Sequence, residues 1–172
     1  MKKIIFILTA IVAMGSAQNA FAQKQKSIVD IAVGNKDFST LVTALKAADL
    51  VGALQGDGPF TVFAPTNAAF GNIDSATLNS LLEPKNVGTL KSILTYHVVP
   101  GKLAATDVVA ALKKGNGKAT VKTLNGASLN VVQKDGKIWL EDANGNYSQI
   151  TSTDVMASNG VIHVIGDVVM PK

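Results

Sequence analysis

Cysteine is absent from the 172 residues, and histidine occurs twice, as His97 and His163. Without a thiol the chain forms no disulfide, no thiolate metal site, no cysteine nucleophile and no cysteine-linked lipid anchor. Aromatic residues make up 5% of the chain, and every basic residue is lysine. Arginine and stacked aromatics are the usual means of binding nucleic acids, so the composition argues against a nucleic-acid partner.

Long hydrophobic runs are also scarce, and the main one, Ile4 to Met14, lies near the N-terminus. Two lysines precede this run, and small residues follow it as far as an A-F-A sequence at residues 20–22. This order predicts a signal peptide over residues 1–22. Because a membrane span needs about 20 apolar residues, we expect no membrane insertion. The prediction is export to the periplasm or out of the cell.

Residues 23–172 have the length of one ordinary domain. They carry 14 lysines against 12 acidic residues, a net charge of +2, so the mature chain is only slightly basic. A cysteine-free exported domain of this size must be held together by burial of its apolar residues. We therefore expect one well-packed core.

The first half of the domain has helical patterns, and the second half has strand patterns. Apolar residues at helical spacing follow Asp37, Asp74 or Ser75, Asn86 and Thr106, which can cap helices. The segment 60–65 is rich in β-branched and aromatic residues and ends at proline, which predicts a buried strand. Thr66 or Asn67 then caps a brief helix.

From residue 119 onward, alternating runs are separated by Asn125-Gly126 and Asp135-Gly136, which are strong hairpin signals. A polar loop is expected over residues 143–150, leading into a strand around residues 151–156. The last run, VIHVIGDVVMP, is apolar at nearly every position and predicts a central strand. The helical patterns and the strand patterns are thus separated along the chain.

Four stretches together resemble the fasciclin domain family. They are FSTLVTALKAADL at 38–50, GPFTVFAPTNAAF at 58–70, ILTYHVVPG at 93–101 and ASNGVIHVIGDVVMP at 157–171. The resemblance covers nearly all of the mature chain, in the order and spacing of the family. It implies an α+β fold, a wedge of about seven strands in two sheets with short helices packed around its edge and along one side.

The resemblance also implies an extracellular interaction module, commonly adhesive, with a protein or matrix partner and no family-wide catalytic activity or cofactor. In animal members a Tyr-His pair with flanking aliphatic residues is assigned to integrin binding. That motif maps onto a candidate interaction surface formed by Leu94, Tyr96, His97, Val98 and Val99. The partner itself does not carry over to a chain with a bacterial type of signal peptide, and self-association is a further expectation.

Enzymatic and metal sites find little support among the residues themselves. The chain has no G-x-S-x-G elbow, and both histidines lie in apolar β-type runs. His97 and His163 would need to converge with Asp167 to bind zinc, but the ligand spacings typical of zinc sites are absent. At Thr66 and Asn67 helix capping is favoured over anion binding. We therefore predict a chain that is not an enzyme, with no metal and no cofactor.

Two questions stay open at this stage. Strand alternation would place Tyr96 with Val98 on one face and His97 with Val99 on the other, so one of the pair could be buried and the other exposed. Our hypothesis is that His97 is mostly buried and hydrogen-bonded at a helix-to-strand junction, with aliphatic neighbours contributing to a contact surface. The alternative is that Tyr96 and His97 are purely architectural. The alternative function is a periplasmic carrier of a small apolar ligand, which would require a pocket of a few hundred Å³.

Overall fold

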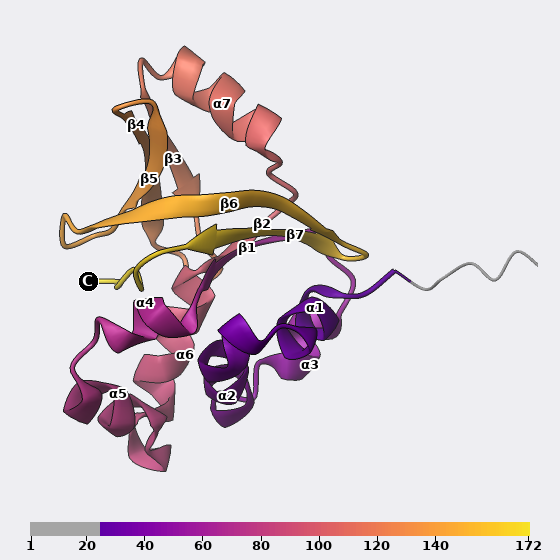
Figure 1. Cartoon of the computed structure of the whole chain (residues 1–172), viewed down its shortest axis with the longest axis vertical. Helices are drawn as coiled ribbons and strands as arrows, with labels where there is room; N and C mark the ends of the chain where they lie inside the picture. Colours follow the sequence, from indigo (N-terminus) through magenta and orange to yellow (C-terminus); the bar gives the residue numbers. More distant parts are fainter. Residues whose placement is uncertain (1–24) are drawn as a thin grey trace, which may run out of the picture.

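The computed structural model describes residues 25–172. The predicted signal peptide, residues 1–22, lies outside this range. Figure 1 shows a curved β-sheet with most of the helices on one side of it and one helix, α7, beyond its opposite end. The helical segments are α1 (Ile28–Gly34), η1 (Lys36–Phe38), α2 (Ser39–Ala47), α3 (Val51–Gln55), α4 (Asn67–Gly71), α5 (Ser75–Leu82), η2 (Pro84–Asn86), α6 (Val87–Tyr96) and α7 (Ala105–Lys114). The strands are β1 (Phe60–Pro65), β2 (Val98–Pro100), β3 (Lys118–Lys122), β4 (Ser128–Lys134), β5 (Lys137–Glu141), β6 (Tyr147–Ala157) and β7 (Gly160–Ile165).

The seven strands form a sheet in the order β2-β1-β7-β6-β5-β4-β3. Strands β1 and β7 are parallel, and the other neighbours are antiparallel. Strand β7 lies between β1 and β6 and is buried along nearly its whole length, which confirms the expected central strand. The expected α+β fold with seven strands is therefore confirmed.

The two expected sheets are halves of one sheet that bends along β6. The start of β6 pairs with β5, and the remainder pairs with β7. Two irregularities in the β6–β7 register lie between Ile150 and Val155, and Asp154 has a φ of 58° there. Bulges of this kind increase the twist of a strand. The twist brings the two sheet edges together, where the N–H of Leu124 donates to the carbonyl of Val98 at 2.7 Å.

This bend creates two apolar cores. The helical core lies between helices α1–α6 and one side of β1, β2 and β7, with Phe38, Leu45 and Ile162 among its members. The sheet core lies within the curved sheet, where Val108 and Leu112 of α7 pack with Leu129. Both cores pack without a disulfide, since the chain has no cysteine.

Several local predictions are confirmed. Thr66 caps α4 and Asp74 caps α5 through side-chain oxygens that accept backbone N–H groups. The Asp135-Gly136 turn joins β4 directly to β5, with both residues at positive φ as a type I′ hairpin requires. The Asn125-Gly126 signal marks a longer connection, because β3 ends at Lys122 and β4 begins at Ser128.

Other local predictions are wrong. Asp37 does not cap the first predicted helix, since it lies inside η1 and α2 begins at Ser39. Asn86 flanks α6, but its side chain bonds to Ser80 instead of capping the helix. Thr106 lies within α7, which is preceded by Ala104.

The polar loop expected over residues 143–150 is shorter than predicted, because β6 already begins at Tyr147. The loop is tightened by Asp142, whose carboxylate accepts the backbone N–H groups of Asn144 and Asn146 at 2.9 Å each. This turn starts the strand four residues earlier than the sequence pattern indicates.

Candidate functional site

His97 lies where α6 ends and β2 begins, with 3% of its surface exposed. Its Nε2 accepts the backbone N–H of Val169 at 3.2 Å, so Nδ1 carries the proton and donates to the carbonyl of Ile93 at 2.8 Å. The expectation of a buried, hydrogen-bonded histidine at a helix-to-strand junction is thus confirmed. Both ring nitrogens have backbone partners, which leaves neither for a metal ion or for proton transfer.

Burial lowers the pKa of His97 from 6.5 to about 4, because the charged imidazolium would lose its hydration. The hydrogen bond to Ile93 acts in the opposite direction and is the smaller effect. The imidazole is therefore neutral at physiological pH. A neutral ring with an acceptor at Nε2 is what the bond to the Val169 N–H requires.

Tyr96 is the last residue of α6 and is completely buried in the sheet core together with Val99. Its hydroxyl donates to the carbonyl of Ser128 at 2.9 Å. Burial, and to a smaller extent the nearby Asp142 carboxylate, raises the pKa of the phenol. Leu94 and Val98 lie in the helical core instead, and His97 lines a cavity with them.

The expected division of this segment into faces is therefore wrong. Strand alternation does not reach Tyr96, because that residue is helical and His97 has helical backbone angles. Each of the five residues proposed as an interaction surface is at most 4% exposed. The predicted interaction surface is therefore buried at all five positions: Leu94, Tyr96, His97, Val98 and Val99. A partner would have to contact other residues, whose positions these five hold in place.

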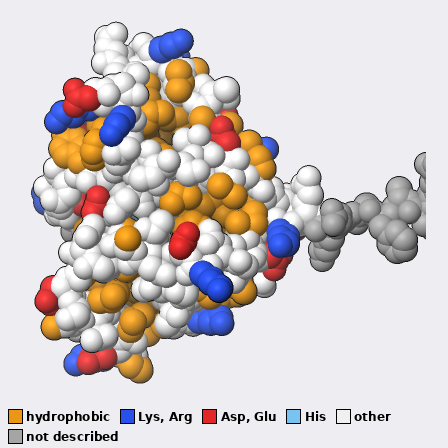
Figure 2. Space-filling model, viewed as in Figure 1, with side chains coloured by type: hydrophobic (Ala, Val, Ile, Leu, Met, Phe, Trp, Pro, Cys, Tyr) orange, Lys and Arg blue, Asp and Glu red, His pale blue; other side chains and the backbone are white. Residues whose placement is uncertain are grey.

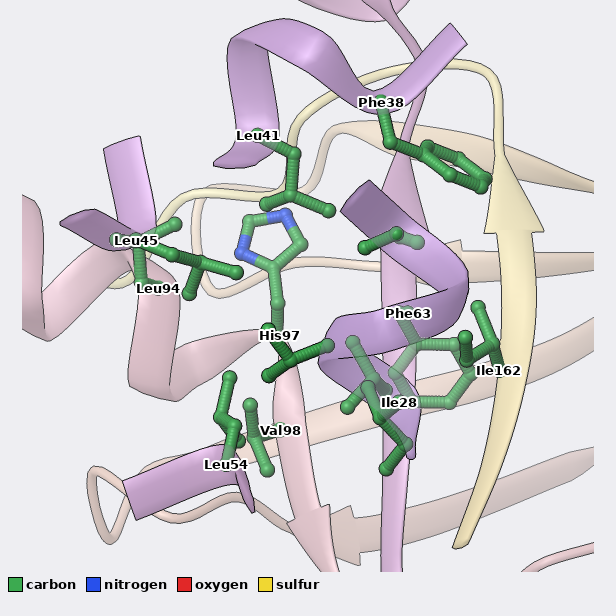
Figure 3. A pocket seen from close by; sticks show the side chains of 14 residues that line it. Ile28, Phe38, Leu41, Leu45, Leu54, Phe63, Leu94, His97, Val98 and Ile162 are labelled. Carbon is green, nitrogen blue, oxygen red and sulfur yellow. The ribbon is translucent and has the colours of Figure 1, made fainter. Parts of the chain in front are cut away.

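The cavity beside His97 is apolar and nearly filled. Figure 3 shows the imidazole directed into it beside Leu41 and Leu45, with Phe38 and Ile28 contributed by the N-terminal helices. The remaining space is about 20 Å³, which is room for about one water molecule. A small apolar ligand does not fit into this space, so the alternative of a ligand carrier gains no support from it.

Buried polar groups around His97 hold residues 166–172, which we call the C-terminal segment. Besides the His97 bond to Val169, the carboxylate of Asp142 accepts the N–H of Met170 at 3.1 Å. Ser148 Oγ donates to the carbonyl of Asp167 at 2.8 Å and accepts its N–H at 3.0 Å. At its start the N–H of Gly166 donates to the carbonyl of Gln149 on β6 at 3.0 Å, and the side chains of Ser148, Asp142 and His97 hold the residues that follow.

An open groove runs between α6 and the C-terminal segment. It has a volume of about 500 Å³ and is lined by Gly88, Thr89, Ser92 and Ile93 of α6 and by residues 170–172. We call it the C-terminal groove. The Ile93 carbonyl, which accepts the hydrogen bond from His97 Nδ1, belongs to one wall of the groove. The N–H that donates to His97 Nε2 belongs to Val169, the residue directly before the other wall. The buried imidazole therefore joins both walls of an exposed groove.

His163 has a similar bracing role on β7. Its Nε2 bonds to the carbonyl of Leu103 at 2.7 Å, and its Nδ1 accepts the N–H of Asp154. The Oδ1 atom of Asp154 accepts the N–H of Ala105 at 2.8 Å, at the start of α7. The two histidines thus hold different segments, and the side chain of Asp167 does not bring them together, since its carboxylate accepts a hydrogen bond from Asn72.

Comparison with known proteins assigns this domain to a family. The family model of the fasciclin domain matches residues 36–171. This chain is a member of the fasciclin domain family. Within the part that the structure describes, every helix of this fasciclin domain is too short or too polar to cross a bilayer.

Relatives of the domain occur in bacteria and animals. Protein sll1483 of Synechocystis is 47% identical over 95% of this chain and 81% of its own length. The transforming growth factor-beta-induced protein ig-h3 of Sus scrofa is 34% identical over 84% of this chain, which spans only 19% of that longer protein. The structure of a fasciclin domain pair from the insect cell adhesion molecule Fasciclin I matches with a TM-score of 0.73 at 19% identity, over 83% of this chain and 50% of the other.

Proposed function

We propose that this fasciclin domain is an exported, non-catalytic module that binds a protein at a cell surface or in a matrix, through the C-terminal groove. The observation that carries the proposal is the buried bracing by His97, which connects α6 to the C-terminal segment without exposing the imidazole. Burial of a polar ring between two walls of an open groove is compatible with supporting a surface, and the two hydrogen bonds of the ring leave neither nitrogen of His97 free for catalysis.

Two further observations support this function. The fasciclin domain pair of similar fold comes from a cell adhesion molecule. The N-terminal sequence predicts a signal peptide, which accounts for export. The mature protein should begin at Gln23, and mass spectrometry of protein recovered from the periplasm and from the culture medium tests both cleavage and location.

The groove is tested by filling it without disturbing either core. Thr89 is exposed on α6 and lines the groove, so Thr89→Arg should reduce binding to cells of the producing strain or to their matrix. The matched control is Thr43→Arg, at an exposed position of α2 outside the groove lining. Purified mature protein on beads, incubated with cells and with culture medium, gives the readout. Equal binding by both variants would refute the groove as the contact surface.

Self-association is an outcome of the same experiment. If beads carrying the protein capture soluble copies of the same chain, sedimentation velocity of the wild type and of Thr89→Arg shows whether the groove is involved. Capture that is lost in Thr89→Arg identifies a second copy as the partner. Capture that is retained assigns self-association to another surface.

A further inference from the structure

The charges of the domain are distributed unevenly between its two ends. Residues 113–137, which run from the last two residues of α7 through β3 and β4 to the first residue of β5, contain six lysines and one aspartate, a formal charge of +5. The remainder of residues 25–172 contains seven lysines and eleven acidic residues, a formal charge of −4. The nearly neutral total therefore conceals a strongly basic end.

The strand register collects most of these lysines on one face of the sheet. Lys118 lies opposite Val132, which lies opposite Trp139 on β5. Side chains two residues apart along a strand share a face. The face that carries Trp139 therefore also carries four exposed lysines, Lys118, Lys122, Lys134 and Lys137. We call this face of the sheet the lysine face. The opposite face of these strands carries Leu129 and Val131 into the sheet core.

Local stability does not account for the lysine face. Lys118 forms an ion pair with Glu141 at 2.7 Å, but no other lysine of the face is ion-paired among residues 25–172. Lys134 and Lys137 lie directly opposite each other across the hairpin, an arrangement of like charges that is destabilising. By contrast, the neighbouring pair Lys113 and Lys114 lies in the last turn of α7, where the helix dipole favours a positive charge.

An apolar and aromatic centre lies between these lysines. Trp139 and Val132 are half-buried neighbours, and the indole Nε1 is buried without a hydrogen-bond partner among the described residues. Tyr147 lies opposite Glu141 on the neighbouring strand β6 and is 48% exposed, and its hydroxyl donates to the Glu141 carboxylate. Figure 2 shows hydrophobic side chains at the β3–β5 end of the molecule, with lysine side chains and an acidic side chain among and beside them.

We propose that the lysine face binds an acidic polysaccharide. Lys118 and Lys122 are about 13 Å apart along β3, and neighbouring strands are about 4.8 Å apart, so the ammonium groups form a broad array suited to a chain with repeated negative charges. The aromatic rings offer flat apolar surfaces to sugar rings between the charges. A membrane surface is less suited, since Tyr147 is the one strongly exposed large hydrophobic residue on this face among those described. The absence of arginine disfavours nucleic acid.

This site is separate from the C-terminal groove, so either proposal can fail without the other. The test uses the full mature chain and alginate, a polymer of carboxylated sugars, with neutral dextran as the control polymer. Because Trp139 is the single tryptophan of the chain, its fluorescence reports contact at the centre of the face. Affinity electrophoresis through alginate-containing gels measures the same binding independently.

Two triple variants with the same change of net charge separate the lysine face from general attraction. The first is Lys122→Gln, Lys134→Gln and Lys137→Gln, and the second is Lys26→Gln, Lys36→Gln and Lys46→Gln, exposed positions at the other end of the domain. We expect the first to weaken alginate binding on the order of tenfold, the combined effect of three surface ion pairs, and the second to leave it nearly unchanged. Both should retain the wild-type melting temperature within a few degrees.

The wild-type affinity should fall as NaCl is raised from 20 to 200 mM, since exposed charges are screened over this range. Absence of binding at 20 mM NaCl, equal weakening in the two triple variants, or binding without a change in Trp139 fluorescence would each overturn the proposal. Tighter binding to anionic vesicles or to DNA than to alginate, lost in the same lysine variant, would also overturn it by assigning the face to another class of partner.

Discussion

The pKa of His97 predicts how the stability of the domain depends on pH. Burial lowers this pKa from 6.5 in the unfolded chain to about 4 in the folded one. Above pH 6.5 the imidazole is neutral in both states, and its contribution to stability is fully present. As the pH falls below 6.5 the unfolded state takes up a proton that the folded state refuses, so the free energy of unfolding decreases. A difference of 2.5 pKa units corresponds to about 3 kcal/mol by pH 4.

The assay is urea unfolding of the wild type and of His97→Gln at pH values from 7.5 to 4. The glutamine side chain offers an acceptor near the position of Nε2 but does not titrate. At pH 7.5 we expect His97→Gln to be less stable by roughly 1–3 kcal/mol, because the Ile93 carbonyl and the Val169 N–H lose well-placed partners. At pH 4 this difference should vanish or reverse.

Subtracting the two pH profiles cancels the contributions of all other titratable groups, which are present in both proteins. A constant difference between the profiles from pH 7.5 to 4 would refute the reasoning. So would a carbon chemical-shift titration that places the midpoint of His97 near 6.5 in the folded protein. Either result would mean that the ring reaches solvent and does not brace the C-terminal groove as described.

Three further predictions concern other parts of the domain. Gly160→Ala should lower the free energy of unfolding by several kcal/mol, or prevent folding, because the added Cβ would overlap sterically with the Phe60 carbonyl oxygen. In thermal unfolding, Gly52→Ala, with nothing within 4 Å in α3, should instead stabilise by roughly 0.5–1 kcal/mol. Lys118→Met should raise the pKa of Glu141 in an NMR titration, since the bond from Lys118 is the main cause of its lowered value. An unchanged Glu141 titration would show that this ion pair does not persist in solution.

Much of the strand half of this protein could be predicted because its signals are local. Asp135-Gly136 supplies both positive φ values of its turn, and the continuous apolar run of β7 matches a strand buried on both faces. The helical half was harder. Helix α1 was missed although Ser27 and Asp30 form a capping box, and the break between α2 and α3 occurs at Asp49, which has a positive φ that no sequence pattern requires.

Sequence alone determined that this chain has a fasciclin fold, that it lacks disulfides and that His97 stands at a junction of helix and strand. The tertiary structure decided what that junction does. Tyr96 and Val99 are buried because of where α6 ends and because both side chains enter the sheet core. Packing between segments far apart in the chain sets the end of the helix and the choice of core. The partner of His97 at Val169 is 72 residues away, and the lysine face exists only when β3, β4 and β5 align in register. Such contacts depend on which strands pair and how the sheet bends, and no local pattern records that choice.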